Sequence, residues 1–396
     1  MSENENRWPT NERLGFGITI VDWERRVDMV KLRKDRLERT QQKMREANVD
    51  LLVLNRLENA RYTTGIKRLY WPTIRLGAGP IVALPQEGDP GIWITDPSYA
   101  AQTLEWVPED RFFDGPEMEL EPDVRNFVDE LTTLFPGVDK QRIGVDVWSP
   151  VMHELLPQLL PDADLVDGQH VMFEARKTKT FEEIQLLKMA YVISEAGMQE
   201  AYEALRPGVK ESDLVGIAMR RFWDFASETV QCSENVNSGP GSYPYRRFHT
   251  DRIIQWGDVV NMDFGACFNG YFGDFCRGFV CGGKPNKGQQ EMIERAYEIQ
   301  MSIVDAIRPG VRPADIAKEV GQNHLGHGFG IAAFEAPHLR IPQDDYVIEP
   351  GMTFAIGTPS SIGSPELGCI HYEDQLYVTE DGCVQYSTYP YFGINQ

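Results

Sequence analysis

The sequence predicts an α/β domain followed by an α+β domain that contains an internal duplication. Helical and strand patterns alternate from about residue 23 to residue 170, which is typical of an α/β domain. Further along, the motif Glu-Ala-Leu-Arg-Pro-Gly-Val at 203–209 returns at 305–311 as Asp-Ala-Ile-Arg-Pro-Gly-Val. A duplication at this distance predicts two similar halves, each a helix pair with a set of strands, and a cleft between them.

Residues 1–172 are assigned to the first domain. A charged segment from Trp23 to Ala47 carries apolar residues at roughly helical spacing and predicts a helix. Short apolar strands are expected at 51–54, 79–84, 91–95 and 142–146, with another helix near 120–134.

Residues 173–396 are assigned to the second domain. Its first helix is predicted after Thr180, because Glu183 stands three residues further on and completes a capping box ahead of an apolar face. The basic run at 176–179 is interpreted as a solvated linker. Each copy of the repeated motif ends one helix at Pro-Gly, and another helix is expected soon after it.

Composition excludes several classes of partner. The 396 residues carry a formal net charge of −21, whereas nucleic acid and anionic membranes require a basic face. No apolar run approaches the ~18 residues of a membrane span, and the acidic N-terminus does not fit a signal peptide. The 6 cysteines form no C-x-x-C pair, which favours reduced thiols in a cytoplasmic protein.

Two aspartates lie on a predicted β-hairpin. Asp263 and Asp274 stand on either side of Asn269-Gly270, a dipeptide that strongly favours a two-residue hairpin turn. Two carboxylates on one half-buried sheet face repel each other, so they require a cation, a proton or a basic partner. We interpret them as metal ligands; the alternative is that they pair with Arg277 or are solvated.

Two further residues extend this candidate site. His327 lies among glycines at 326–330, where the backbone can approach a ligand closely, and Glu373 lies in a predicted strand at 370–379. The alternatives are a histidine satisfied within a loop and a glutamate in an edge-strand salt bridge. Two Asp, one His and one Glu form a ligand set that suits Mn, Fe, Co or Zn.

The order of these motifs resembles the pita-bread superfamily, which includes methionine aminopeptidase, aminopeptidase P, prolidase, creatinase and a dimethylsulfoniopropionate lyase. The motifs are G-D-V-V-x-x-D, D-F-C-R, G-H-G-F-G, E-P-G-M-T-F and Y-E-D-x-L-x-V-T-E-D-G. Residues 50–54 and 61–65 resemble the creatinase-type N-terminal domain, and the run at 23–39 looks closest to the lyase branch. The resemblance implies a creatinase-type domain followed by a pita-bread catalytic domain. It also implies a homodimer, because such N-terminal domains usually border the partner's active site.

By position, the resemblance implies metal ligands at Asp263, Asp274, His327 and Glu373. The family's fifth ligand, a glutamate, falls at Gly357 in this sequence. The lost carboxylate would have served one metal together with Asp274 and His327, whereas the ligands of the other metal, which include Asp263, survive. One or two divalent ions are therefore expected, with Glu366 as an alternative ligand.

The residues that move protons depart from the family pattern. Peptidases of the family carry a histidine where this sequence has Arg246, and a second where it has Phe334. Without them, peptide hydrolysis loses partners worth about 10²-fold each, which disfavours a general aminopeptidase. The candidate catalytic residues that remain are Glu335, Glu373, His338 and Arg246.

The leading hypothesis is a hydrolase that cleaves a C–N bond in a small polar nitrogen compound, with Glu335 or Glu373 moving the proton of an activated water. The alternatives are a metal-dependent lyase of a dimethylsulfoniopropionate-like substrate, an Xaa-Pro-type aminopeptidase and a non-catalytic binding protein. Aromatic faces can contact a cationic substrate, although core aromatics are common. The candidate substrate-binding residues are Tyr70, Trp71, Trp93 and His371.

Overall fold

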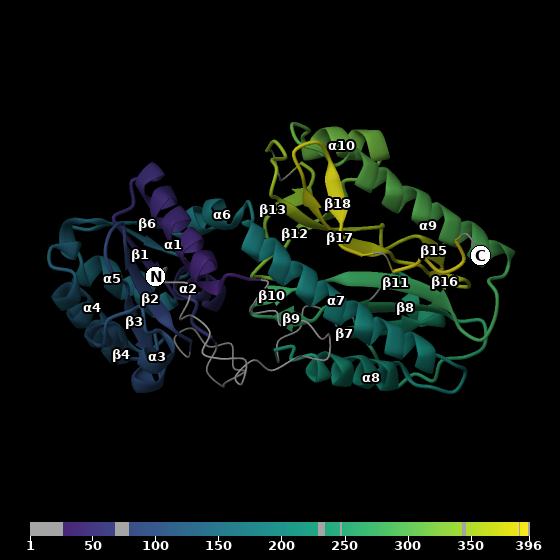
Figure 1. Cartoon of the computed structure of the whole chain (residues 1–396), viewed down its shortest axis with the longest axis horizontal. Coiled ribbons are helices and arrows are strands. Elements are labelled where there is room, and N and C mark those ends of the chain that lie inside the picture. The colour runs from purple at the N-terminus through teal and green to yellow at the C-terminus, as the bar shows by residue number, and fades with distance from the viewer. Residues whose placement is uncertain are drawn as a thin grey trace, which may run out of the picture. The chain divides into compact units, whose positions relative to one another are not determined.

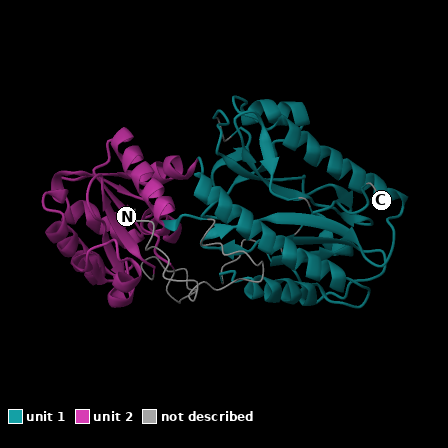
Figure 2. Cartoon of the chain, in the orientation of Figure 1, with its two compact units in different colours: residues 1–29, 178–396 teal, residues 30–177 magenta. Residues whose placement is uncertain are grey.

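The chain forms two compact units. The computed structural model describes residues 27–67, 79–228, 234–245, 248–342, 346–387 and 389–394. One unit consists of residues 30–177, and the other contains residues 178–396 (Figure 2). Three predicted site residues lie outside the described residues: Tyr70, Trp71 and Arg246. Within the described ranges, no helix is long and apolar enough to cross a membrane.

The unit of residues 30–177 is built on a six-stranded mixed sheet in the order β4-β3-β2-β1-β5-β6 (Figure 1). Its strands are β1 (Leu51–Leu54), β2 (Ile81–Pro85), β3 (Gly91–Ile94), β4 (Phe112–Asp114), β5 (Arg142–Val145) and β6 (Asp164–Asp167). Its helices are α1 (Met29–Glu46), α2 (Leu57–Thr64), α3 (Pro97–Thr103), α4 (Glu121–Leu134), α5 (Pro150–Leu159) and α6 (Gln169–Arg176). Apolar residues of β1, β3, β5, α4 and α5 share one buried core, which confirms the predicted α/β class.

The unit that contains residues 178–396 is built on an eight-stranded sheet in the order β13-β12-β14-β17-β11-β8-β7, with β18 paired to β17. Its first strands are β7 (Glu234–Ser238), β8 (Val259–Phe264), β9 (Cys267–Phe268), β10 (Tyr271–Phe272) and β11 (Phe275–Val280). The later strands are β12 (His324–Gly328), β13 (Glu335–Arg340), β14 (Thr353–Gly357), β15 (Gly363–Ser364), β16 (Gly368–Cys369), β17 (Glu373–Val378) and β18 (Cys383–Gln385). Its helices are α7 (Phe181–Ala204), α8 (Glu211–Asp224), α9 (Lys287–Ala306) and α10 (Pro313–Val320).

The sheet of this second unit shows the duplication. In the first half α7 and α8 precede β7, β8 and β11, and in the second half α9 and α10 precede β12, β14 and β17. The strand order β7-β8-β11 returns in reverse as β17-β14-β12, and β11 meets β17 antiparallel at the centre. The two copies of the repeated motif, at 203–209 and 305–311, span the C-terminal ends of α7 and α9. The predicted α+β class and its internal duplication are confirmed.

Two local sequence patterns form the predicted structure, and a third does not. Thr180 and Glu183 form both hydrogen bonds of the predicted capping box at the start of α7. Asn269-Gly270 joins β9 to β10 with φ angles of 48° and 85°, as a type I′ hairpin turn requires. The basic run at 176–179, in contrast, is not a solvated linker. Arg176 is buried against Asn59, and Lys179 is buried in an ion pair.

Candidate metal centre

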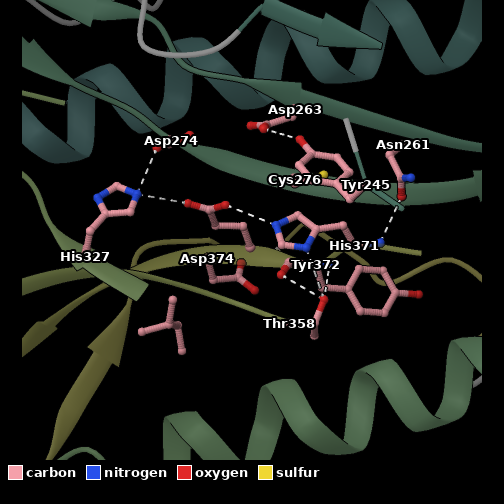
Figure 3. A network of polar contacts seen from close by, with 12 residues as sticks. Tyr245, Asn261, Asp263, Asp274, Cys276, His327, Thr358, His371, Tyr372 and Asp374 are labelled. Carbon is pink, nitrogen blue, oxygen red and sulfur yellow. Dashed lines mark hydrogen bonds and ion pairs between the residues drawn. The ribbon is translucent and has the colours of Figure 1, made fainter. Parts of the chain in front are cut away.

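Three of the predicted metal ligands converge on one point. Asp274 immediately precedes β11, His327 lies in β12 and Glu373 begins β17, so the ligands come from both halves of the duplication. All three are buried, and one donor atom from each lies within 4.8 Å of the others (Figure 3).

The geometry of this group fits a divalent metal ion. His327 Nε2 lies 3.6 Å from Asp274 Oδ2 and 3.5 Å from Glu373 Oε1, and makes no hydrogen bond with the described residues. Donors that sit about 2.0–2.2 Å from a tetrahedral ion are about 3.3–3.6 Å apart. One imidazole and two carboxylates also match the preferences of Mn, Fe, Co and Zn. The residues present can therefore hold one such ion.

The backbone around His327 fixes the direction of its ring. His327 Nδ1 lies 3.1 Å from the carbonyl oxygen of Gly328. In the neutral ring, Nδ1 must donate in this contact, so Nε2 directs its lone pair toward the two carboxylates. The strand can come this close because Gly326 adopts a φ of +150°, and a Cβ there would lie 2.0 Å from the carbonyl oxygen of Ala355 in β14.

Asp263 does not belong to this group. Its Oδ2 accepts a hydrogen bond from the hydroxyl of Tyr245. Burial, together with the Asp263 carboxylate, raises the pKa of Tyr245 well above its ordinary value, so the hydroxyl keeps its proton and donates it. The sequence had predicted that the ligand set containing Asp263 would survive. The structure instead brings His327 together with Asp274 and Glu373. His327 belongs to the ligand set that was expected to be weakened, because Gly357 replaces its glutamate.

His371 occupies the space beside Gly357. A Cβ at Gly357 would lie 3.2 Å from His371 Cε1 and 3.3 Å from His371 Nε2. The same Nε2 lies 3.3 Å from Glu373 Oε2, and the imidazole stacks on the ring of Tyr245 with centroids 4.3 Å apart. His371 therefore contacts a candidate metal ligand directly. Glu366, the alternative ligand, is exposed and lies outside the group.

Electrostatics favour an ionised Glu373. Burial acts to raise the pKa of this carboxyl group, but the imidazoles of His327 and His371 outweigh it and hold the pKa below its ordinary value. An ionised carboxylate is the form that binds a metal.

Two predicted catalytic residues lie on β13. Glu335 is fully buried, and its Oε1 lies 2.7 Å from Lys179 Nζ. In this arrangement the charge of Glu335 balances a buried ammonium, which argues for a structural role; its role in proton transfer stays a prediction. His338 is half-buried on the same strand and lies outside the three-residue group.

Trp93, which the sequence predicted to bind substrate, has no exposed surface. The side chain is fully buried in the core of the unit of residues 30–177. Its ring stacks on Phe113 with centroids 4.9 Å apart, and its Nε1 donates a hydrogen bond of 2.7 Å to Glu130. Trp93 is therefore a core aromatic residue.

Two residues of the site were not predicted in their actual roles. Tyr245 is one position before Arg246, and the aromatic run Tyr243-Pro244-Tyr245 is the only sequence signal for it. Phe334, noted only as a missing histidine, places its ring 4.0 Å from that of His327 and is 48% exposed. An apolar face therefore lies directly beside the candidate ligands.

Comparison with known proteins agrees with this description. The model of metallopeptidase family M24 matches residues 185–380, and the creatinase/prolidase N-terminal domain matches residues 36–178. The Xaa-Pro dipeptidase of Pyrococcus furiosus is 27% identical over 364 residues, which cover 88% of this chain and 96% of that protein. A recombinant prolidase from Thermococcus sibiricus gives a TM-score of 0.74 at 22% identity, covering 91% of this chain and 98% of that one. The prolidase from Pyrococcus horikoshii gives 0.71 at 21% identity, covering 91% and 100%. These structural likenesses concern the fold.

Proposed function

Because this chain belongs to the pita-bread creatinase and prolidase superfamily, we propose that it is a metal-dependent hydrolase that cleaves a C–N bond in a small amide. The observation that carries the proposal is the convergence of Asp274, His327 and Glu373 at distances suited to one divalent ion. The buried position of all three favours an ion site over a set of solvated surface charges.

The residues around the ion have separable roles. A divalent ion held there would polarise the amide carbonyl and lower the pKa of a bound water. His327 presents Nε2, and the two carboxylates supply negative charge that balances a dication. His371 Nε2, 3.3 Å from Glu373 Oε2, is placed to hold a proton shared with that carboxylate.

The surroundings of the ion support a small substrate. Phe334 stands where peptidases of the family carry a histidine, and its ring packs at a tilt against that of His327 and offers no proton donor. Hydrolysis of unactivated peptides is expected to be slow without such a donor. A second candidate is hydrolysis of Xaa-Pro dipeptides, because relatives such as the Pyrococcus furiosus protein carry that name and the Xaa-Pro bond is also a C–N amide bond.

The test is product analysis with protein of defined metal content. The chain is stripped with a chelator, reloaded with Mn²⁺, Co²⁺ or Zn²⁺, and incubated with small amides, Xaa-Pro dipeptides and a sulfonium compound. Mass spectrometry then identifies the products. We expect hydrolysis of a small amide that disappears on chelation and returns with metal.

Matched variants make the result specific. Asp274→Asn should lose both metal and turnover, whereas Glu366→Gln removes an exposed carboxylate and should keep both. Cleavage of Xaa-Pro dipeptides alone would select the second candidate. Elimination from the sulfonium compound without hydrolysis, or binding without any product, would refute a hydrolase.

We further propose that the enzyme is a cytoplasmic homodimer. The homodimer rests on the resemblance to creatinase-type N-terminal domains. The cysteines within the described ranges are all free, which suits a reducing compartment. Light scattering should give twice the chain mass of 45.0 kDa; a mass of one chain would refute the dimer.

A further inference from the structure

A row of residues crosses the centre of the eight-stranded sheet in the unit that contains residues 178–396. Strand by strand, the row runs through Asp263, Cys276, Glu373 and Gly357. Residues paired directly across neighbouring strands share a sheet face, so these side-chain positions point the same way. In the duplication, β8 corresponds to β14 and β11 corresponds to β17. Asp263 in β8 and Gly357 in β14 therefore occupy equivalent positions at the two ends of this row. The second half of the duplication therefore lacks the carboxylate that the first half carries.

Two stacked rings lie between the carboxylates of this row. The hydroxyl of Tyr245 donates to Asp263 Oδ2, and His371 Nε2 lies 3.3 Å from Glu373 Oε2. The two rings are 4.3 Å apart between centroids, with planes at 19° (Figure 3). We refer to Tyr245 and His371 as the stacked pair. Each member is in contact with one carboxylate oxygen that could otherwise bind an ion.

The stacked pair also limits what can stand at the Gly357 end. His371 Cε1 and Nε2 lie 3.2 Å and 3.3 Å from the position of a Cβ at Gly357, which is tighter than ordinary van der Waals contact. His371 itself is only 7% exposed, so the ring has little room to move aside. A carboxylate cannot be added at Gly357 without displacing this ring.

We propose that the centre takes a single divalent ion, on Asp274, His327 and Glu373, and that the stacked pair excludes a second ion from the space between Asp263 and Glu373. This inference rests on the proposed metal-dependent function. Two carboxylates and one neutral imidazole suffice for one dication with an open position for substrate or water. A second dication would need Asp263, whose Oδ2 accepts the hydrogen bond from Tyr245, and the space that the two stacked rings fill.

The experiment measures the number of bound ions per chain and does not depend on turnover. The full-length chain is saturated with Mn²⁺, freed of excess ion, and analysed by mass spectrometry of the metal and by calorimetric titration. We expect one equivalent in the unmodified chain and two in Tyr245→Ala/His371→Ala, which removes the hydrogen bond from Tyr245 to Asp263 and opens the space beside Glu373. Phe334→Ala is the matched control, because it removes another ring beside the ligands and should leave one equivalent.

A second measurement does not depend on the folding of a variant. Electron paramagnetic resonance of the Mn²⁺-loaded, unmodified chain should show isolated ions, without the coupling expected for two ions that share a carboxylate. Two equivalents in the unmodified chain, or a coupled spectrum, would overturn the inference while leaving the proposed function intact. No bound ion in folded protein would refute the metal centre itself, so the two failures can be told apart.

Discussion

Lys179 and Glu335 form an ion pair in which each side chain is only 1% exposed. Removing one partner leaves the other charge buried and uncompensated, which costs about 3–5 kcal/mol. We therefore expect Glu335→Gln to lower the free energy of unfolding by about that amount and to leave the metal content of the folded protein unchanged. Urea denaturation and metal analysis of the same preparation would measure both.

A surface pair in the same unit provides the control. Lys287 and Glu291 are 3.8 Å apart, with side chains 93% and 66% exposed. Exposed pairs contribute little, so Glu291→Gln should unfold almost as the unmodified chain does. If Glu335→Gln were as stable as this control and yet lost turnover, Glu335 would regain the catalytic role that its ion pair argues against.

The difference between the ligands and their neighbours explains what the sequence could predict at this scale. Asp274, His327 and Glu373 stand in motifs whose order and spacing can be read along the chain. Tyr245 donates to Asp263, 18 residues further along the chain. His371 contacts Glu373 only two positions away, but its ring is held by stacking on the distant Tyr245. No local pattern encodes the stacking of Tyr245 on His371, because it arises only when distant segments of the chain fold together.

At the scale of the element, the close approach of β12 to β14 depends on glycine. A Cβ at Gly326 would lie 2.0 Å from the carbonyl oxygen of Ala355, and the φ of +150° is one that other residues rarely adopt. We expect Gly326→Ala to separate the two strands and displace His327. The free energy of unfolding should fall by about 2–5 kcal/mol, as for other severe changes in a protein core. Thermal unfolding and metal content would show both effects.

A second glycine gives the opposite expectation. Gly216 lies inside α8, and a Cβ there would meet nothing within 4 Å. Alanine in a helix interior is more favourable than glycine by about 1 kcal/mol, so Gly216→Ala should raise the unfolding temperature. If Gly326→Ala were as stable as Gly216→Ala, β12 and β14 could not approach each other at Gly326 as closely as described.

Asp146 makes the stability of the first unit depend on pH. This buried residue follows β5, and desolvation raises its pKa to about 6 despite hydrogen bonds from Asn59 and two backbone amides. The pKa of Asp146 in the folded state exceeds the ordinary value of 3.8, so the folded state favours the protonated carboxyl group. The contribution of Asp146 to the free energy of unfolding is therefore full below about pH 4 and is lost as the pH rises through about 6. The loss should be about 3 kcal/mol.

Hydrogen exchange of β1 and β5, corrected for the intrinsic exchange rate at each pH, would follow this change. Asp146→Asn cannot ionise and should give a flat profile over the same range. Stability that rises with pH instead would mean that the three donors keep the carboxylate charged in the folded state.

Elements with local signals were the most predictable. The capping box at Thr180 and the turn at Asn269-Gly270 depend on residues a few positions apart, and both form as expected. The basic run at 176–179 was misjudged because its burial depends on distant partners, Asn59 for Arg176 and Glu335 for Lys179. Charge alone predicts exposure only where no such partner exists.

At the scale of the whole molecule, the duplication explains why the candidate metal ligands come from separate motifs. β11 and β17 meet at the centre of the sheet, and each half brings a carboxylate to that junction, Asp274 from the first and Glu373 from the second. His327 arrives from β12 in the second half. The repeated helix-ending motif revealed this architecture in the sequence, although it contributes no residue to the group.

Metal binding should therefore stabilise the two units unequally. Among the described residues, separate buried apolar clusters lie within 30–177 and within 178–396, and the candidate ligands lie in the second range. An ion that binds only the folded site adds about 2.7 kcal/mol at 100 times its dissociation constant. We expect metal to slow hydrogen exchange in β11, β12 and β17 and to leave β1 and β5 unchanged.

Asp274→Asn, which removes a candidate ligand, should abolish this slowing of exchange in all three strands. Equal protection of β1 and β5 would show that the units unfold as one, and no protection anywhere would show that the group binds no ion.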